Sequence, residues 1–225
     1  MISKKIQILL ISILFIACDR SEDKSTLIDV DGNVYQTVTI GNQTWMAENL
    51  RVTHYADGSK IAEITECNDW QSLGQSAEAY CFYDNDPNNQ YGAYYTFEAA
   101  KKACPKGWHL PTKNEWDELK IYLYNNGYNA IEGSALKSKS GWNKSSDNKL
   151  GFNAFPTGRR YRNMISNNCI GEFYSVGEVG NWWSSTDFDS NFAYYTWISI
   201  SSDDFTVGND VKKTGLSVRY LKDRD

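Results

Sequence analysis

The chain has 225 residues, with 28 acidic and 23 basic side chains and a formal net charge of −5 at neutral pH. Nucleic-acid phosphates are bound through basic patches, so this acidic balance argues against DNA or RNA as a partner. Eight tryptophans, 15 tyrosines and nine phenylalanines supply enough apolar surface for the core of a single domain of about 200 residues.

The N-terminus has the pattern of a bacterial export signal. Two lysines precede an apolar run from Ile6 to Ala17, and the run ends at Cys18. A transmembrane helix needs about 20 apolar residues, so this shorter run is typical of a signal peptide. The four residues ending at Cys18 resemble a lipobox, and we expect Cys18 to carry a lipid anchor. An ordinary secreted protein cleaved nearby is the alternative.

These features divide the chain into three parts. We expect residues 1–17 to be a lipoprotein signal peptide and residues 18–28 to be a lipidated flexible tether, because residues 19–27 are polar without apolar periodicity. Residues 29–225 are then one domain. The expected location is the outer membrane or cell surface of a Gram-negative bacterium, with the membrane contacted through the lipid on Cys18.

Four cysteines remain after the anchor, and an exported protein is expected to use them in disulfides. Four cysteines allow three connectivities, which sequence alone does not distinguish. Spacing favours Cys67 with Cys81, which would close a small loop, and Cys104 with Cys169, which would tie the helical region to the second half of the chain.

The first predicted element of the domain is a β-hairpin. Two β-rich runs within residues 32–49 flank Gly41-Asn42, a dipeptide that favours tight hairpin turns. The preceding residues 29–32 resemble a calcium loop, but their glycine comes too early for an EF-hand, and we expect a turn.

Residues 51–90 show little periodicity and predict a long, ordered surface loop. The loop contains a cluster of side chains whose oxygens suit calcium. Turns use the same residue types for backbone reasons, so we expect a turn there and no metal site. The cluster consists of Asp84, Asn85, Asp86 and Asn88.

Two helices are predicted next, over residues 96–103 and 113–125. The second begins with a capping box, in which Thr112 caps the helix and Glu115 reaches back to it. It ends near Gly127, a residue suited to a left-handed C-cap. One face of this helix predicts a core stripe. The stripe consists of Trp116, Leu119 and Leu123.

The second half of the chain predicts irregular structure followed by strands. Residues 141–160 are rich in glycine and aromatic residues and show no regular pattern. Residues 192–201 predict a strand with large apolar groups on both faces, which indicates burial on both sides. Residues 216–221 predict a closing strand.

Six motifs occur in an order that resembles the Fibrobacter succinogenes major paralogous domain family, common in exported bacterial proteins. The resemblance covers residues 29–223. The motifs are DGNVYQTVTIGNQTWMAENL, YDND followed by YGAYYTFEAA, CPKGWHLPTKNEW, GFNAFPTGRR, NWWSST and GLSVRYLKD.

That family is similar to the formylglycine-generating-enzyme and C-type-lectin-like folds. The resemblance implies an irregular α+β fold with two main helices, antiparallel β-sheets and neighbouring N- and C-terminal strands. The closing motif of the family usually reads Ser-Val-Arg-Cys, but Tyr220 occupies the cysteine position here. If that cysteine normally bonds the one in the Cys-Pro-x-Gly-Trp motif, Cys104 needs another partner, and Cys169 is the candidate.

The chain lacks the patterns that would predict an enzyme. Formylglycine-generating relatives use a pair of cysteines late in the chain, whereas no cysteine follows Cys169 here. The two histidines, His54 and His109, are too few for a three-histidine iron site. Gly-x-Ser-x-Gly, Walker-type and His-Glu-x-x-His motifs do not occur. We therefore expect no catalysis and no cofactor, and a structural role for His109.

The candidate ligand-binding residues lie in two loops, expected within residues 151–162 and 181–186. Tryptophan and tyrosine faces can stack on a sugar ring, although they serve a core equally well. Arginines can bind a carboxylate or pair with surface acids, and we favour the pairing. The candidates are Trp182, Trp183, Arg159, Arg160 and Tyr161.

The sequence therefore predicts an exported, lipid-anchored protein of the cell envelope with a non-catalytic interaction domain. Its candidate partners are glycans or another surface protein. Two alternatives stay open, an enzyme with altered chemistry on a formylglycine-generating scaffold and a structural envelope component without a small ligand. Neither Glu-Pro-Asn nor Gln-Pro-Asp occurs, which argues against calcium-dependent sugar binding of the C-type-lectin kind.

Overall fold

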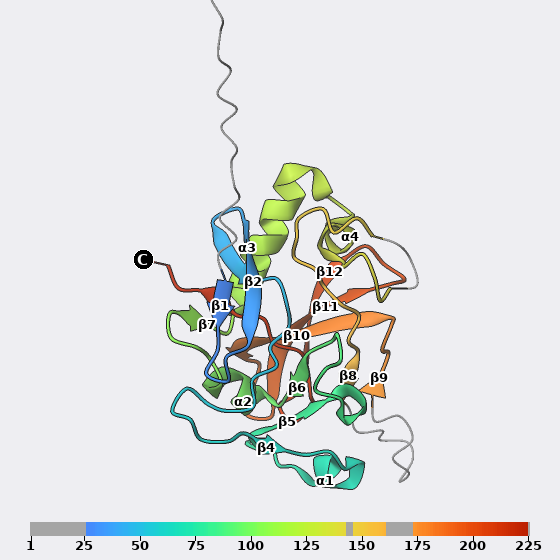
Figure 1. The fold of residues 1–225 in the computed structure, drawn as a ribbon. Coiled ribbons are helices and arrows are strands. Elements are labelled where there is room, and N and C mark those ends of the chain that lie inside the picture. Colours follow the sequence, from blue (N-terminus) through green and yellow to red (C-terminus); the bar gives the residue numbers. More distant parts are fainter. Residues whose placement is uncertain (1–25, 143–145, 161–172, 225) are drawn as a thin grey trace, which may run out of the picture.

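The computed structural model describes residues 26–142, 146–160 and 173–224. Within these residues short helices pack among small, mainly antiparallel sheets, which is the expected α+β class. Figure 1 shows helix α3 (Lys113–Leu123) at one end of the molecule and helix α1 (Cys67–Ser72) at the other. Among the described residues, each helix is too short or too polar to cross a bilayer.

One sheet contains both the first and the last described strand. Its order is β1-β2-β3-β13-β7, with antiparallel neighbours throughout. The C-terminal strand lies between two others, because Leu221 is opposite both Trp45 and His109. The strands are β1 (Thr26–Ile28), β2 (Val34–Ile40), β3 (Gln43–Met46), β7 (Trp108–His109) and β13 (Leu221–Lys222).

The predicted hairpin is confirmed as β2 and β3, joined by a two-residue turn in which Ile40 is opposite Gln43. Gly41 has a φ of +65°, which a residue with a side chain rarely adopts. A Cβ at this position would also lie 2.7 Å from the ring of Tyr122 on α3. Glycine is therefore required both by the turn and by the helix that crosses it.

The last three residues of the expected tether form strand β1 instead, and the rest of it lies outside the described residues. Leu27 is buried and explains why this segment joins the sheet. The turn expected at residues 29–32 is confirmed, since Asp29 Oδ1 accepts the backbone N–H groups of Asp31 and Asn33. Short amphipathic segments of this kind carry too little periodicity to be separated from a tether by sequence.

Both predicted helices are confirmed. The first is α2 (Phe97–Lys102), and α3 begins with the complete capping box of Thr112 and Glu115. A single π-helical turn, η2 (Tyr124–Tyr128), follows α3, and Gly127 within it has a φ of +88°. The predicted stripe faces the core, with Trp116, Leu119 and Leu123 all buried.

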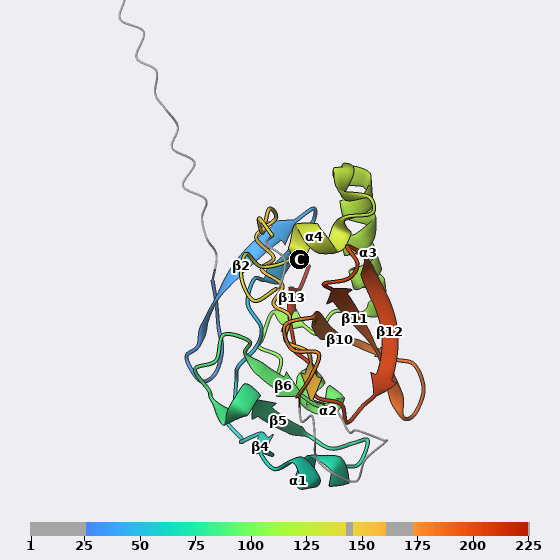
Figure 2. The same ribbon diagram turned by 90° about the vertical axis from the view of Figure 1, so that its right-hand side faces the viewer.

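A second sheet, β10-β11-β12, contributes buried residues to both large core clusters. Figure 2 shows it as a layer on the opposite side of the molecule from β2, with β13 between them. Strand β10 packs against both α2 and α3, so adjacent residues Trp182 and Trp183 enter different core clusters. The strands are β10 (Val179–Asp187), β11 (Phe192–Ser199) and β12 (Phe205–Val211).

The expectation of a long loop over residues 51–90 is wrong, because this region contains α1 and part of a small sheet. All four residues of β5 are buried, so the strand shows no polar alternation that would mark it in the sequence. Strand β8 also interrupts residues 141–160, which were expected to be irregular, and α4 and β9 lie in parts of the chain for which no element was predicted. The elements are β4 (Ala62–Glu63), β5 (Ala79–Phe82), η1 (Tyr83–Asn85), β6 (Ala93–Tyr95), α4 (Glu132–Leu136), β8 (Arg159–Arg160) and β9 (Phe173–Tyr174).

The expected disulfide pairings are wrong. Cys67 is disulfide-bonded, but Cys81 and Cys104 retain their thiols, so neither is its partner. The pairing of Cys104 with Cys169 is excluded for the same reason, and Cys18 and Cys169 lie outside the described residues. The Cys104 thiol instead donates a hydrogen bond to the Trp108 carbonyl oxygen at 2.8 Å. Tyr220, which occupies the cysteine position of the family motif, is fully buried, and its hydroxyl donates to the Ala100 carbonyl oxygen.

Candidate functional site

Arg219 is the centre of a buried polar network. Its side chain is fully buried, and desolvation lowers the pKa of its guanidinium to about 9. A buried cation is costly unless its donors are satisfied. Arg219 donates to the Asn49 side chain at 2.8 Å and to the backbone carbonyls of Met46, Phe152 and Asn153.

Asn49 is the second member of this network and uses all of its polar groups. Its Oδ1 accepts from Arg219 Nε and from Trp182 Nε1 at 2.9 Å, while its Nδ2 donates to the Tyr91 carbonyl oxygen at 2.8 Å. Three segments far apart in sequence are thus tied to the end of β3. The sequence interpretation singled out neither Asn49 nor Arg219, because burial of a polar residue cannot be read from a single sequence.

A pocket of about 320 Å³ opens on the solvent side of this network. We call it the carboxamide pocket, since four of its nine lining residues carry side-chain amides. Four segments contribute: the start of β2, the chain after β3, the loop before β6 and the segment after Phe152. The lining residues are Val34, Glu48, Asn49, Arg51, Asn89, Gln90, Gly92, Asn153 and Phe155.

Two backbone features shape the carboxamide pocket. Gly92 has a φ of +79°, and a Cβ there would lie 2.8 Å from the Leu50 carbonyl oxygen and 2.9 Å from Asn49 Cβ, so only glycine permits this close approach. Asn153 has a φ of +58° in the left-handed region, which asparagine tolerates better than most residues. This conformation accompanies the hydrogen bond from Arg219 to the Asn153 carbonyl oxygen.

Charged groups stand at one side of the carboxamide pocket. Arg51 pairs with Glu48 at 3.6 Å, donates to Asn33 Oδ1 and the Val34 carbonyl oxygen, and lies 4.8 Å above the Tyr35 ring. About a third of the Arg51 and Glu48 side chains is exposed. The guanidinium is thus held in place while part of it faces solvent.

Amides and an aromatic ring complete the pocket. Among the described residues, no hydrogen bond involves the side chains of Gln90 or Asn153, whereas Asn89 is held by Asp86 and Tyr91. The Phe155 ring is half-buried, and the Tyr91 ring supports it edge-on at 6.3 Å. Amides both donate and accept, and an apolar ring covers the faces of sugars, so this lining suits a polyhydroxylated ligand.

The two tryptophans predicted to bind ligand do not reach the surface. Trp182 and Trp183 are fully buried in β10, which was expected to be a loop. Trp182 donates to Asn49, and Trp183 donates to the Tyr95 carbonyl oxygen at 2.9 Å. Their assignment as ligand-binding residues is wrong, because neither ring has a face open to a ligand.

The predicted arginine cluster serves structure as well. Arg159 pairs with Asp210 at 2.7 Å. The sequence favoured pairing with surface acids, whereas Asp210 is buried. Arg160 is buried. Its guanidinium donates a hydrogen bond to the Thr65 carbonyl oxygen and lies 5.2 Å from the centroid of the Trp70 ring. Tyr161 lies outside the described residues. Within the predicted segment 151–162, Asn153 and Phe155 line the carboxamide pocket.

His109 has the structural role that the sequence predicted. Its Nδ1 lies 2.7 Å from Asp223 Oδ1, and its Nε2 lies 2.9 Å from Glu115 Oε1. Burial opposes protonation of the ring, but hydrogen bonds from the ring to the Asp223 and Glu115 carboxylates raise the pKa of His109 above its ordinary value. The imidazole therefore joins the C-terminal segment to the start of α3.

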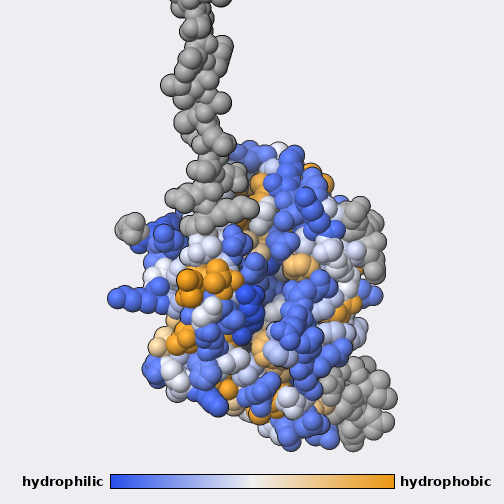
Figure 3. Space-filling model, viewed as in Figure 1, coloured by the Kyte–Doolittle hydropathy of each residue, from blue (hydrophilic) through white to orange (hydrophobic). Residues whose placement is uncertain are grey.

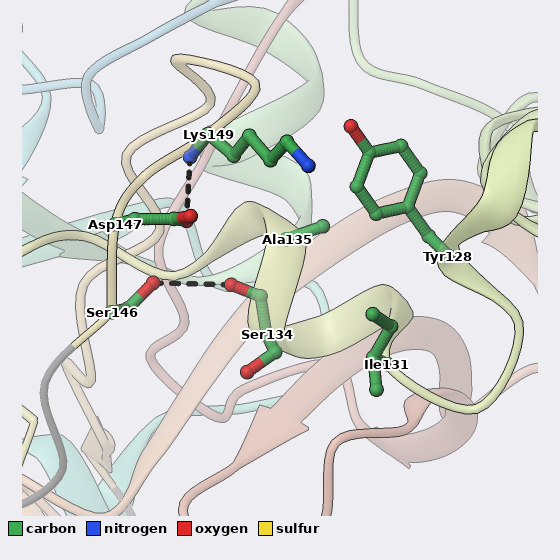
Figure 4. Close-up of a pocket in the computed structure, with 7 residues that line it drawn as sticks. All are labelled: Tyr128, Ile131, Ser134, Ala135, Ser146, Asp147 and Lys149. Atoms are coloured by element: carbon green, nitrogen blue, oxygen red, sulfur yellow. Dashed lines mark hydrogen bonds between the residues drawn. The ribbon is translucent and has the colours of Figure 1, made fainter.

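Two further pockets have different linings. The larger, of about 500 Å³, lies between η2, α4 and the segment around Ser146. Figure 4 shows the Tyr128 ring and the Lys149 side chain on one side of it and Ser134 on α4 below. The other, of about 430 Å³, is lined by His54, whose Nδ1 lies 2.6 Å from Asp31 Oδ1.

The residues considered for calcium form a turn within the described part of the chain. There, no group of three or more His, Cys, Asp or Glu side chains could hold a metal ion. Asp86 Oδ1 accepts the Asn88 backbone N–H at 2.9 Å, and Asp84 and Asn85 have left-handed φ values of 50° and 57°. This is the turn that the sequence favoured.

Comparison with known proteins agrees with the motif pattern. A family model described as the Fibrobacter succinogenes major domain matches residues 38–222. No curated protein matches the chain, and no solved structure matches it. The match includes both members of the buried network and every residue of the carboxamide pocket except Val34.

Proposed function

The chain belongs to the Fibrobacter succinogenes major domain family, and on that premise we propose that it is an exported, lipid-anchored protein of the cell envelope whose domain binds glycans without catalysis. The observation that carries the binding part is the carboxamide pocket. Its Gln90 and Asn153 amides, its Arg51 and Glu48 pair and its Phe155 ring are the groups that sugar hydroxyls and sugar faces require.

The proposal for location rests on the N-terminal sequence. An apolar run of signal-peptide length ends at Cys18 in a lipobox-like sequence, which supports export, lipidation and attachment to the outer membrane. Strand β1 begins at Thr26, so only a short segment would separate the domain from the lipid. Replacing Cys18 with alanine should abolish partitioning into a detergent phase, and persistence of the membrane-bound form would contradict lipidation.

We further propose that the domain is a distant relative of the C-type-lectin-like and formylglycine-generating-enzyme folds. Two main helices, small antiparallel sheets and a first and last strand in one sheet are compatible with such a relationship. An experimental structure superposed on both folds would test it, and a different order of strands in the core would contradict it.

Glycan binding is tested with a glycan array probed by the full acylated chain in detergent. We expect binding to a restricted set of oligosaccharides. Two variants, Gln90→Ala and Asn153→Gly, should weaken it. Glycine at position 153 keeps the left-handed backbone while removing the amide. The matched control is Asn114→Ala on the exposed face of α3. An array without any bound glycan would contradict the proposal.

The second candidate function is an enzyme with altered chemistry, and one observation favours it. Burial opposes ionisation of Asp31, but hydrogen bonds from Thr53 and His54 hold its pKa below the ordinary value. The ionised carboxylate lies 2.6 Å from His54 Nδ1, and the His54 ring lines a pocket. No substrate chemistry follows from this pair alone, so binding remains the preferred function over this and over a purely structural role.

A further inference from the structure

Three exposed apolar residues gather beside the carboxamide pocket. Ile28, Val30 and Val34 are 61%, 49% and 45% exposed, and Ile28 is the cross-strand partner of Val34. Figure 3 shows an apolar area over β1 and the adjoining part of β2. We call these three residues the β1–β2 patch. An apolar group on an edge strand is unfavourable in water, so it is expected to have a partner.

The β1–β2 patch and the carboxamide pocket are continuous, because Val34 belongs to both. Arg51 lies at their boundary, where its guanidinium donates to the Val34 carbonyl oxygen at 3.0 Å. A ligand that fills the pocket and extends past Val34 would therefore pass from polar amides to an apolar surface. This change in lining matches a molecule with a hydroxyl-rich head and an apolar remainder.

The position of the patch relative to the anchor identifies where such a molecule would come from. Strand β1 begins at Thr26, eight residues after Cys18. Eight extended residues span at most about 29 Å, so a lipid on Cys18 would hold β1 within that distance of the bilayer. This step rests on the proposed function, since it uses the lipid anchor and the glycan-binding pocket.

We propose that the ligand is the sugar headgroup of a glycolipid in the membrane that holds the chain. The sugar occupies the carboxamide pocket, and the first apolar atoms of the lipid cover the β1–β2 patch. A soluble glycan, or one carried by another cell, would use the pocket alone. A bare lipid surface would use the patch alone.

Hydrogen exchange on the full acylated chain separates these cases. The chain is reconstituted in phosphatidylethanolamine vesicles with and without rough lipopolysaccharide, and a third sample receives the delipidated core oligosaccharide instead. We expect both ligands to protect the loop at residues 89–92 and the segment at residues 153–155. Only the intact glycolipid should add protection over residues 26–34.

A pair of variants supplies a quantitative readout. Ile28→Ser combined with Val30→Ser should weaken binding of lipopolysaccharide about tenfold, since two exposed apolar contacts are lost. The same double variant should leave affinity for the core oligosaccharide unchanged, because neither residue lines the carboxamide pocket. Ile121→Ser is the matched control, because Ile121 is 59% exposed on α3 outside the patch.

The outcomes separate this inference from the proposed function. Equal protection by glycolipid and oligosaccharide, or an unaffected double variant, would overturn the glycolipid inference and leave glycan binding in place. Protection of residues 26–34 in vesicles without lipopolysaccharide would overturn it in favour of a lipid surface. Protection by neither ligand would also overturn it, while the glycan array decides independently whether the pocket binds sugars.

Discussion

Arg219 Nε donates to Asn49 Oδ1 at 2.8 Å across 170 positions of sequence, inside a core where both side chains are nearly inaccessible to water. Trp182 donates to the same oxygen. Through this atom the closing segment, β10 and the end of β3 are fixed to one another. The carboxamide pocket lies directly on this network, so the fold and the candidate site share residues.

The first prediction concerns this network. Asn49→Ala should lower the free energy of unfolding by about 3 kcal/mol or more, because it leaves two buried donors and the Tyr91 carbonyl oxygen without a partner. Chemical denaturation measures the change. In a double-mutant cycle with Trp182→Phe, a coupling of about 1 kcal/mol is expected. Additive effects would show that the two side chains do not share the interaction.

The second prediction concerns Gly41. Gly41→Ala should destabilise the domain by about 1–2 kcal/mol from its left-handed backbone, with an additional cost from the contact with Tyr122. Gly58→Ala is the control, since Gly58 has a φ of +82° and nothing lies within 4 Å of the added Cβ. When Gly41→Ala is combined with Tyr122→Ala, only the additional cost of the contact with the Tyr122 ring should disappear. Equal destabilisation at positions 41 and 58 would contradict the steric part.

The third prediction concerns pH. Asp223 and Glu115 raise the pKa of His109 in the folded state. The protonated ring therefore stabilises the fold fully at pH values below the pKa of His109 in the unfolded chain, and this stabilisation is lost as the pH rises through the pKa of His109 in the folded protein. A third of the side chain is exposed, so screening limits the effect to less than about 1 kcal/mol. His109→Asn should therefore cost more stability at pH 5.5 than at pH 8.5, measured by denaturation in low salt. A cost that grows with pH would contradict this account.

The fourth prediction concerns the cysteines. Burial raises the pKa of the Cys104 thiol to about 12, so alkylation of the folded protein at pH 8 should be slow compared with the unfolded chain. Peptide mapping without reduction should find Cys67 in a disulfide and Cys81 and Cys104 as thiols. A peptide that links Cys67 to Cys81 would contradict the structure.

Local patterns predicted local structure well. The capping box fixed the start of α3, and Gly41-Asn42 fixed the turn of the first hairpin, because both signals lie within a few residues of the element they define. The short strand β5 was missed, since burial of all four residues removes the alternation that marks a strand.

The candidate site was harder to predict than the helices. Sequence placed Trp182 and Trp183 among possible ligand contacts, because exposed and buried aromatics look alike until their neighbours are known. Asn49 and Arg219 were not identified, since their pairing depends on the complete fold. Only the segment containing Asn153 and Phe155 was anticipated, from its position in an irregular region next to the core.

The fifth prediction concerns the carboxamide pocket, and titration calorimetry of the strongest glycan from the array tests the central claim most directly. The titration uses the full acylated chain, and Gln90→Ala and Asn153→Gly should each weaken binding about tenfold, as expected for the loss of one or two hydrogen bonds to a ligand. Asn114→Ala should bind as tightly as the unaltered chain. Unchanged affinity in both pocket variants would contradict the assignment of this pocket as the glycan site.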